Sequence, residues 1–498
     1  MRYLLMPLVA SLVLGTTARA QRPAQTSANA LLNPGFWQEK PNLDAVKAAV
    51  EKGANAAELN GNSFDPVVLA INSGAPNDAI LYLLEQKGND VNKLTHDSRT
   101  YIFWSASKGN TEIMQYLLSK GAKVDIQDSH GATPVLFAAG GAQQDTKVYD
   151  LLINKGVNLK TDLNHDGANA LLLAVGNDPE FKLTDYFVSK GLDIKSKDAA
   201  GNTAFDYAAR SGNIKNMKLL LSKGVSFTNS ALIMASLGGR GKGNSLEVFQ
   251  YLESLGIKPT ATAKNGDNVL HALVRRPGQN DIVKYFLDKG VNVNQANEEG
   301  TTPFMNAAAG NRDTAIFTLL KPQVKNINLA NKNGQTALAL AVKGNSPEVV
   351  QYLLDNGAAI NTTDAKGNNL VYYLFDSYSP RTAKDFEAKL ALLKTKGLDV
   401  AAPQKDGNTL YHLAVAKNDL ALLKLVQTFG VDVNAKNKEG LTALHKAAMI
   451  AKDDSALKYL LSIGAKKEIG TSFNETAFQL ASENEFLSKQ HISVDFLK

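Results

Sequence analysis

A short motif recurs along almost the whole chain, at intervals that average about 34 residues. One copy reads NEEGTTPFMNAAAGN, from Asn297 to Asn311, and comprises a turn, a Thr-Pro pair and a run of small residues. A single unit of this size cannot bury its apolar face, whereas a row of units buries a continuous core between neighbours. The repetition therefore predicts an array of small stacked units in place of several independent globular domains.

The residue in register with Thr302 of this motif is Asp, Thr, Asn or Ser in every copy. These side chains accept a hydrogen bond from the free N–H groups in the first turn of a helix, which stabilises it by about 1 kcal/mol relative to Ala. Proline at the next position, as at Pro303, suits the first residue of a helix. We therefore predict thirteen helix N-caps, at Asp65, Thr100, Thr133, Asn169, Thr203, Ser230, Asn268, Thr302, Thr336, Asn369, Thr409, Thr442 and Thr476.

The same series of elements follows most of the predicted caps. A short first helix carries a pair of small residues, such as Ala307 and Ala308, which lets a neighbouring helix approach closely. A second amphipathic segment ends at a Gly that suits the left-handed helix terminator, such as Gly224 or Gly357. An alternating segment rich in Asn and Gly then predicts a β-hairpin finger that leads to the next cap.

These units resemble the ankyrin repeat, which has a period of 33 residues and a T-P-L-H-x-A signature. The best copies are GNTAFDYAARSGN at Gly201, GTTPFMNAAAGN at Gly300, GQTALALAVKGN at Gly334, GNTLYHLAVAKND at Gly407 and GLTALHKAAMI at Gly440. The resemblance covers roughly Asn42 to Glu485. It implies an all-α fold, an α-solenoid of stacked ankyrin repeats with short β-hairpin fingers. We expect about thirteen repeats with terminal caps within residues 31–498.

Several positions depart from the regular pattern. The step of 27 residues between Thr203 and Ser230 leaves no room for a finger, so we expect that hairpin to be missing or reduced. Insertions are expected near residues 238–244 and 376–385, at the edge opposite the fingers. The expected finger Gly is replaced, and ideal turn geometry is in doubt, at Ser63, Ser98, Thr228 and Asn474.

The first twenty residues predict a secretory signal peptide. Arg2 precedes an apolar run from Leu4 to Leu14, and a small-x-small cleavage pattern ends at Ala20. The apolar run is shorter than the roughly 20 residues that cross a bilayer, and no later segment approaches that length. A buried N-terminal helix is the alternative. We expect cleavage after Ala20, a flexible lead over residues 21–30, and a periplasmic or secreted protein without a membrane span.

The composition limits the chemistry that we expect. The chain contains no Cys, which excludes disulfides, thiolate zinc sites and an acyl anchor. The formal charge of +6 falls to +4 without Arg2 and Arg19, an excess too small to indicate a nucleic-acid partner. Neither a G-x-S-x-G nor an H-E-x-x-H motif is present. We therefore predict a protein that is not an enzyme and that uses no cofactor.

Two local groups of residues fit a solvated surface better than a ligand site. In the loop GGRGKG, Lys242 is followed by Gly where a phosphate-binding loop needs Ser or Thr. His96, His130 and His165 fall on successive predicted fingertips, beside Asp97, Asp128 and Asp166. Fingers that follow the spacing of packed helices, about 8–10 Å, keep such ligands apart, whereas zinc needs them about 2.0–2.1 Å from the ion. We therefore expect neither a nucleotide site nor a metal site.

The resemblance also implies where a partner would bind. In this family, partners contact the fingertips and the two exposed positions after the small pair of the first helix. The charged residues at those positions comprise two acids, Asp376 and Glu483, and the basic residues Lys108, Arg210, Arg275, Arg276, Lys343 and Lys417. This stripe predicts a partner protein with an acidic surface, and ordinary solvated charges explain it equally well.

Aromatic and histidine side chains complete the candidate residues. Tyr372, Tyr373, Phe375 and Tyr378 form the densest aromatic cluster, and Tyr372 and Tyr378 are candidate anchors for a partner, with core packing as the alternative. By resemblance, His271, His412 and His445 are structural residues that bond to a neighbouring loop.

We therefore interpret the chain as a non-enzymatic scaffold, expected to be monomeric, that binds another protein through its concave groove and fingertips. Three alternatives remain. The first is a secreted effector that acts on host or competitor proteins, and the second is a binder of anionic glycan in the envelope. The third is a helper that supports a partner enzyme, similar to exported bacterial ankyrin-repeat proteins.

Overall fold

The computed structural model describes residues 29–239 and 243–498. The predicted signal peptide, residues 21–28 of the lead and the centre of the first insertion lie outside these described residues. The chain divides into two compact units. Unit 1 extends to Ala174 and includes Glu180–Ile194, and unit 2 comprises Val175–Pro179 and Lys195–Lys498.

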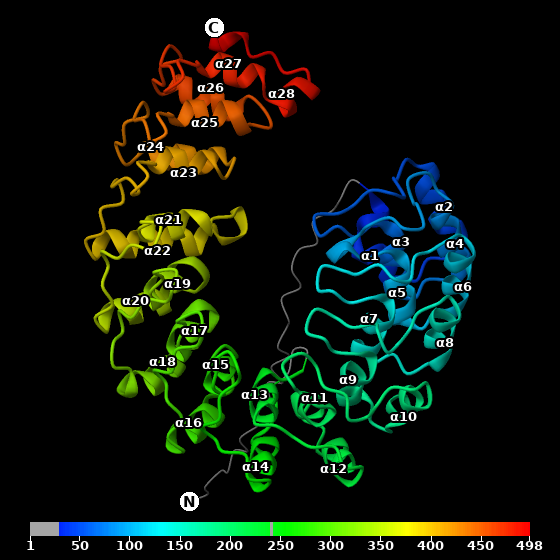
Figure 1. Ribbon diagram of the computed structural model, residues 1–498. Coiled ribbons are helices and arrows are strands. Elements are labelled where there is room, and N and C mark those ends of the chain that lie inside the picture. Colours follow the sequence, from blue (N-terminus) through cyan, green and yellow to red (C-terminus); the bar gives the residue numbers. More distant parts are fainter. Residues whose placement is uncertain (1–28, 240–242) are drawn as a thin grey trace, which may run out of the picture. The chain divides into compact units, whose positions relative to one another are not determined.

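Unit 1 is a stack of helix pairs. The first helices pack against one another in the order α1, α3, α5, α7 and α9, and the second helices α2, α4, α6 and α8 form a parallel row beside them (Figure 1). The elements are η1 (Ala30–Leu32), α1 (Pro34–Gln38), α2 (Leu43–Glu51), α3 (Pro66–Ser73), α4 (Asn77–Leu84), η2 (His96–Ser98), α5 (Tyr101–Lys108), α6 (Thr111–Ser119), α7 (Pro134–Gly140), α8 (Thr146–Asn154), α9 (Ala170–Ala174) and α10 (Lys182–Ser189).

Unit 2 repeats this arrangement over more pairs. Its first helices carry the odd-numbered labels from α11 to α27, and each packs on the next (Figure 1). The elements up to the middle of the unit are η3 (Val175–Asn177), α11 (Ala204–Arg210), α12 (Ile214–Ser222), α13 (Ser230–Leu237), α14 (Leu246–Ser254), α15 (Leu270–Leu273), α16 (Asn280–Asp288), α17 (Pro303–Gly310), α18 (Thr314–Leu320) and η4 (Lys321–Gln323). They are followed by α19 (Ala337–Gly344), α20 (Pro347–Asp355), α21 (Leu370–Asp376), η5 (Pro380–Thr382), α22 (Ala383–Thr395), α23 (Leu410–Val415), α24 (Leu420–Gln427), α25 (Ala443–Ile450), α26 (Ser455–Ser462), α27 (Ala477–Ser482), α28 (Glu485–Lys489) and η6 (Asp495–Leu497).

The predicted N-caps are confirmed at most positions. Thr302 precedes α17 and accepts a hydrogen bond from the backbone N–H of Met305, and Pro303 is the first helical residue. Ser230 and Asn268 are exceptions. Ser230 is the first residue of α13 and is preceded by the cap Asn229. The hydroxyl of Thr228 accepts the hydrogen bond of the Ser230 N–H instead, at 3.0 Å. Asn268 lies two residues before α15, although its side chain still accepts from the Leu270 N–H.

Small residues let the first helices pack closely. Ala307 and Ala308 of α17 are fully buried, as are Ala208 and Ala209 of α11. Larger side chains from the second helices, such as Phe317 of α18, complete the apolar layer between neighbouring pairs. The core of each unit is therefore a continuous apolar layer that extends from one repeat to the next, as expected for a stacked array.

The fingers differ from the predicted β-hairpins, because the described residues contain only isolated bridges, such as Ala330 with Thr336, and no extended strand. In most fingers an Asn or Asp side chain closes the turn in place of a ladder, and Thr471 does so in the last finger. The Oδ1 of Asn297 accepts from the backbone N–H groups of Glu299 and Thr301, both at 3.0 Å. These side chains tighten the turn locally, so the finger needs no strand pairing.

The non-glycine finger positions keep the same turn at a cost in backbone strain. Ser63 has φ 58°, and Asn60 accepts from the N–H groups of Asn62 and Phe64 as in the regular turns. Ser98 and Asn474 also have positive φ, at 60° and 62°. The left-handed region costs a residue with a Cβ roughly 1–2 kcal/mol. These turns therefore have the same shape as the glycine turns but are less stable.

A buried carboxylate replaces the missing finger between α11 and α13. Asp206 is fully buried and accepts hydrogen bonds from the backbone N–H and hydroxyl of Thr203, and from the backbone N–H and hydroxyl of Thr228. Burial raises the pKa of the Asp206 carboxyl, and these hydrogen bonds lower it in part. The sequence correctly predicts a reduced finger here, and Asp206 holds the shortened loop against the helix start.

The second insertion contributes to a long helix. Residues 380–382 form η5, and α22 then continues for 13 residues. The ammonium of Lys389 on α22 is almost fully buried and donates to the carbonyls of Val342 and Asn345, at 2.7 and 3.2 Å. Arg312 and Asp385 form an ion pair at 3.2 Å. Burial lowers the pKa of Lys389, and the lysine satisfies carbonyls at the end of α19 that would otherwise have no intrahelical partner.

Candidate partner-binding surface

The basic residues of the predicted stripe lie at the ends of first helices. Lys108 and Arg210 are the last residues of α5 and α11, and Lys343 lies in the last turn of α19. Arg275 and Lys417 follow shortly after α15 and α23. Cations at helix C-termini complement the helix dipole, so part of this pattern has a purely structural origin. Lys108 belongs to unit 1 and the other residues to unit 2, so we treat only the latter as one surface.

Two members of the stripe are neutralised by one acid. Asp376 at the end of α21 lies between Lys343 and Lys417, with Nζ to carboxylate oxygen distances of 3.2 and 3.5 Å. The Lys417 ammonium also donates to the Asp376 carbonyl. This group carries a net charge of +1 instead of the +2 that the lysines alone would supply. The centre of the stripe is therefore less basic than its sequence suggests.

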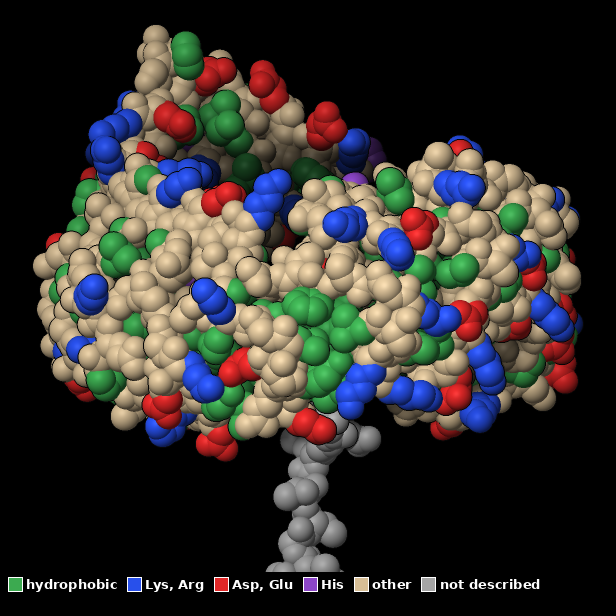
Figure 2. All heavy atoms as spheres, turned by 60° about the horizontal axis from the view of Figure 1, so that its bottom comes forward, with side chains coloured by type: hydrophobic (Ala, Val, Ile, Leu, Met, Phe, Trp, Pro, Cys, Tyr) green, Lys and Arg blue, Asp and Glu red, His purple; other side chains and the backbone are tan. Residues whose placement is uncertain are grey.

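The arginines at the start of the stripe are differently placed. Arg276 donates to the carbonyl of Leu237 at the end of α13, and it therefore links two neighbouring first helices. Arg210 and Arg275 are exposed and form no ion pair with any residue that the structure describes. Their guanidinium groups remain available for an acidic partner. On the face shown in Figure 2, Lys and Arg side chains are interspersed with Asp and Glu side chains.

Further along the same row, α25 ends in apolar residues, before Glu483 at the end of α27. Met449 and Ile450 close α25 at the positions that correspond to Arg275 and Arg276, and their exposed fractions are 50% and 41%. Exposed apolar side chains at such positions favour a partner contact. Both residues lie in the register of the basic stripe, but the charge pattern does not mark them because they are neutral.

The aromatic cluster is partly core and partly surface. Tyr373 and Phe375 are buried, and the Tyr373 hydroxyl donates to Asp364 at 2.7 Å. Burial and the neighbouring Asp364 raise the pKa of Tyr373. Tyr372 and Tyr378 are half-buried, and the Tyr378 ring packs on Phe386 of α22 with 5.1 Å between ring centroids. The two candidate anchors thus retain exposed edges, and the other two aromatic residues serve the core.

The three fingertip histidines do not form one group. His96 and His130 both approach Asp97 in unit 1, with Nε2 to Oδ2 distances of 3.4 Å in each case, and Arg99 contacts the same oxygen at 3.1 Å. His165 instead packs over Gly131, where an added Cβ would lie 2.2 Å from its ring. Among the described residues, no group of three or more His, Asp or Glu side chains is arranged to hold a metal ion.

The signature histidines are structural. His412 is fully buried, its Nδ1 lies 2.9 Å from the Thr409 hydroxyl, and its Nε2 lies 2.9 Å from the Leu441 carbonyl of the next finger. His271 and His445 make the equivalent contacts with Thr301 and Ile469. Burial lowers the pKa of all three rings. Each ring therefore connects a helix start to the following finger, as the resemblance implies.

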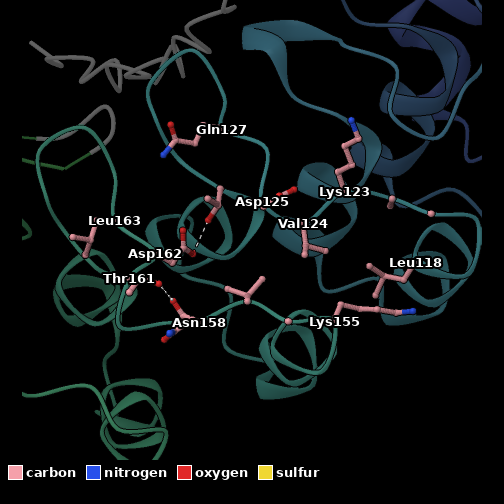
Figure 3. Close-up of a pocket in the computed structure, with 15 residues that line it drawn as sticks. Leu118, Lys123, Val124, Asp125, Gln127, Lys155, Asn158, Thr161, Asp162 and Leu163 are labelled. Carbon is pink, nitrogen blue, oxygen red and sulfur yellow. Dashed lines mark hydrogen bonds between the residues drawn. The ribbon is translucent and has the colours of Figure 1, made fainter.

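Unit 1 contains a pocket that no motif in the sequence predicts. It has a volume of about 710 Å³ and lies between the loops that follow α6 and α8 (Figure 3). Lys123, Asp125, Lys155 and Asp162 are among its lining residues. In the part of the chain that the structure describes, each helix is too short or too polar to cross a membrane.

Comparison with known protein families confirms the predicted ankyrin repeats. The family model described as ankyrin repeats (3 copies) matches residues 38–128, 67–162, 136–231, 232–325, 270–364 and 387–494. These segments together cover most of the chain.

Individual relatives are similar over short segments only. Human transient receptor potential cation channel subfamily A member 1 is 33% identical over 101 residues, which are 20% of this chain and 9% of the channel. Its Caenorhabditis elegans homolog is 33% identical over 138 residues, which are 26% of this chain and 11% of that protein. The chain thus spans about a tenth of the length of these relatives. Among solved structures, the ankyrin repeat domain of Bcl-3 is 24% identical and matches 46% of this chain and 100% of that domain, with a TM-score of 0.34.

Proposed function

Because this chain belongs to the ankyrin-repeat family, we propose that it is a non-enzymatic scaffold, exported from the cytoplasm, that binds another protein. The proposed binding surface is the row of first-helix ends in unit 2, from Arg210 to Ile450. Repeats of this family mediate protein–protein interactions in general, and a stacked row presents one long surface for such contacts.

The exposed and unpaired guanidinium groups of Arg210 and Arg275 carry this proposal. An exposed charge without a partner steers an oppositely charged protein towards the surface and sets its orientation more than it sets the affinity. Met449 and Ile450, at the other end of the row, supply apolar area. We therefore favour a partner with acidic residues facing α15 and an apolar residue facing α25.

The experiment is crosslinking in intact cells, followed by mass spectrometry of the captured partner. The double variant Arg275→Glu/Arg276→Glu should weaken binding of that partner at least tenfold. Arg275→Glu alone separates loss of charge from loss of the contact between Arg276 and Leu237. The matched control is Lys384→Glu/Lys424→Glu, which makes the same charge change on the exposed faces of α22 and α24. Equal affinity of the two double variants would remove the basic surface from the proposal.

Export is proposed from the sequence of residues 1–20. Edman sequencing of the mature protein from an envelope fraction should begin at Gln21. Recovery of the intact chain from the cytoplasmic fraction would contradict export. Recovery from the culture supernatant, with modification or binding of a foreign protein, would favour the secreted effector.

Binding to an anionic glycan is the second candidate, because the same exposed arginines would serve it. Contacts between exposed charges are screened over about 8 Å at physiological ionic strength. A glycan complex should therefore dissociate in moderate salt, whereas a protein complex anchored at Met449 and Ile450 should persist.

A further inference from the structure

Asparagine side chains bridge the loops of several neighbouring repeats. We call the boundary between two such loops a seam. The Nδ2 of Asn92 donates to the carbonyl of Gly121 in the next repeat, and its Oδ1 accepts from the N–H of Lys123, at 3.2 and 2.9 Å. The same pair of bonds recurs at Asn294, Asn328 and Asn434. One asparagine thus satisfies one carbonyl and one amide of the following loop at each of these seams.

Asp125 occupies the equivalent position at the next seam of unit 1. A carboxylate has no N–H to donate, so it cannot bridge the following loop as the asparagines do. The carbonyl of Gly156 and the amide of Asn158 make no hydrogen bond with any residue in 29–239 or 243–498. Both residues line the pocket of about 710 Å³ together with Asp125 (Figure 3). The pocket therefore lies where the carboxamide is missing.

The loop after α8 also has an extra residue relative to its neighbours, and it brings Asp162 to the pocket. The Oδ2 of Asp162 accepts from the Thr133 hydroxyl at 2.8 Å, and no ion pair joins Asp162 or Asp125 to a described cation. Burial raises the pKa of the Asp162 carboxyl, and the hydrogen bond from Thr133 lowers it in part. A partly desolvated carboxylate without a counter-ion favours a cationic group that can approach it.

The remaining lining residues define what else the ligand must contain. Leu118, Val124 and Leu163 give apolar area, and the free carbonyl and amide of Gly156 and Asn158 match the donor and acceptor of a peptide group. Lys123 and Lys155 are exposed, so water screens their charges more than it screens Asp162.

We propose that this pocket binds an extended segment of a partner protein through a basic side chain. The guanidinium or ammonium group lies at Asp162, its aliphatic stem contacts the apolar lining, and a peptide group bridges Gly156 and Asn158. The inference rests on the proposed scaffold function only in assigning the segment to a partner, because the pocket itself can be tested without one.

The experiment measures binding of capped tripeptides to the full chain by ligand-observed NMR. Acetyl-Gly-Arg-Gly-amide should bind at least tenfold more tightly than the norleucine peptide, and the glutamate peptide should be the weakest. Asp162→Asn should reduce the affinity for the arginine peptide at least tenfold, as expected when one partner of a partly buried charge pair is neutralised. Equal binding of the three peptides, or an unchanged affinity in Asp162→Asn, would overturn the proposal.

Two further variants separate loss of peptide binding from loss of folding. Asp125→Asn restores the carboxamide, so it should close the seam, raise the thermal midpoint and abolish binding of the arginine peptide. Asn92→Asp opens the preceding seam without supplying an equivalent of Asp162, and it should add no binding. A gain of binding in Asn92→Asp would contradict the role of Asp162. If no peptide binds, the pocket proposal fails, while the surface in unit 2 remains a separate question.

Discussion

Lys343 and Asp376 form an ion pair between neighbouring repeats, with Nζ and Oδ2 3.2 Å apart. Lys417 approaches the other carboxylate oxygen at 3.5 Å, so one acid serves two lysines. All three side chains are partly exposed, and pairs of this kind contribute little to stability, about 0–1 kcal/mol. The main effect of Asp376 is on the charge of the surface.

Asp376→Asn should therefore make the row of helix ends more basic without unfolding it. We expect the affinity for a fluorescent polyglutamate peptide to rise by about two- to fivefold at low ionic strength, in line with the energy of an exposed charge. Fluorescence anisotropy measures this change. The gain should vanish in 0.5 M salt, where the Debye length is only about 3–5 Å; a gain that persists would assign the effect to something other than charge.

His412→Gln should weaken the dependence of stability on pH. Burial lowers the pKa of His412, and the hydrogen bond with the Leu441 carbonyl raises it only in part. The unfolded chain, with an ordinary histidine pKa of about 6.5, then binds more protons than the folded chain at mildly acidic pH. The free energy of unfolding therefore falls as the pH falls from about 7 through this range, with a slope from one group of at most about 1.4 kcal/mol per pH unit.

Urea titrations of the wild type and the variant at several pH values between 5 and 8 check this sign. The difference between the two proteins isolates His412 from the carboxyls that titrate nearby. The variant should lose stability at neutral pH and show a shallower decline below it. A steeper decline in His412→Gln would contradict the assignment of a neutral, buried ring.

Ser63→Gly should stabilise the first finger of unit 1. Ser63 is exposed and has φ 58°, so its Cβ carries the cost of the left-handed region without making a compensating contact. The release of roughly 1–2 kcal/mol of strain is offset in part by the greater freedom of glycine in the unfolded chain. Thermal unfolding should show a net gain of about 0.5–1 kcal/mol.

The reverse substitution is the matched control. Gly300 has φ 72° in the corresponding turn, and an added Cβ would lie 3.0 Å from the backbone nitrogen of Lys332. Gly300→Ser should therefore destabilise the protein by more than Ser63→Gly stabilises it. The two substitutions must change the free energy of unfolding with opposite signs, because both act on the same backbone conformation.

Asp206→Ala should release the shortened loop between α11 and α13. The carboxylate accepts from Thr203 and Thr228 at four donor atoms, and their loss leaves buried N–H groups without a partner. Each such group costs about 1–3 kcal/mol. Hydrogen exchange of residues 225–229 should accelerate far more than exchange in α25, which lies several repeats away. Uniform acceleration along the chain would show that the loop is not held locally.

The cap register predicts the fold because the rule behind it is local. A side chain at Thr302 or Thr442 bonds within three residues, so its role can be read without knowledge of the rest of the structure. The prediction was wrong at Ser230, where the missing finger shortens the loop and Thr228 takes over as acceptor. It was also wrong on the strands of the fingers, because Asx turns close them without a ladder.

The candidate surface depends on contacts between repeats, and these are less accessible to sequence. Lys417 and Asp376 are 41 residues apart, and nothing in the spacing shows that Lys343 reaches the same carboxylate. Phe375 and Tyr378 are three residues apart and both pack on Phe386 of α22, yet Phe375 is buried and Tyr378 is half-exposed. The replacement of Asn by Asp125, in contrast, is visible in an alignment of the repeats with one another.

The asparagine bridges also determine how the array responds to a mechanical load. Each carboxamide joins only two adjacent loops, so a pulling force along a unit is carried by a series of small links. A link that consists of Asn92 resists separation with two hydrogen bonds, whereas the seam at Asp125 offers neither. Under tension, the link at Asp125 would therefore resist separation less than the link at Asn92, and the adjacent loops could move apart there without loss of the apolar core.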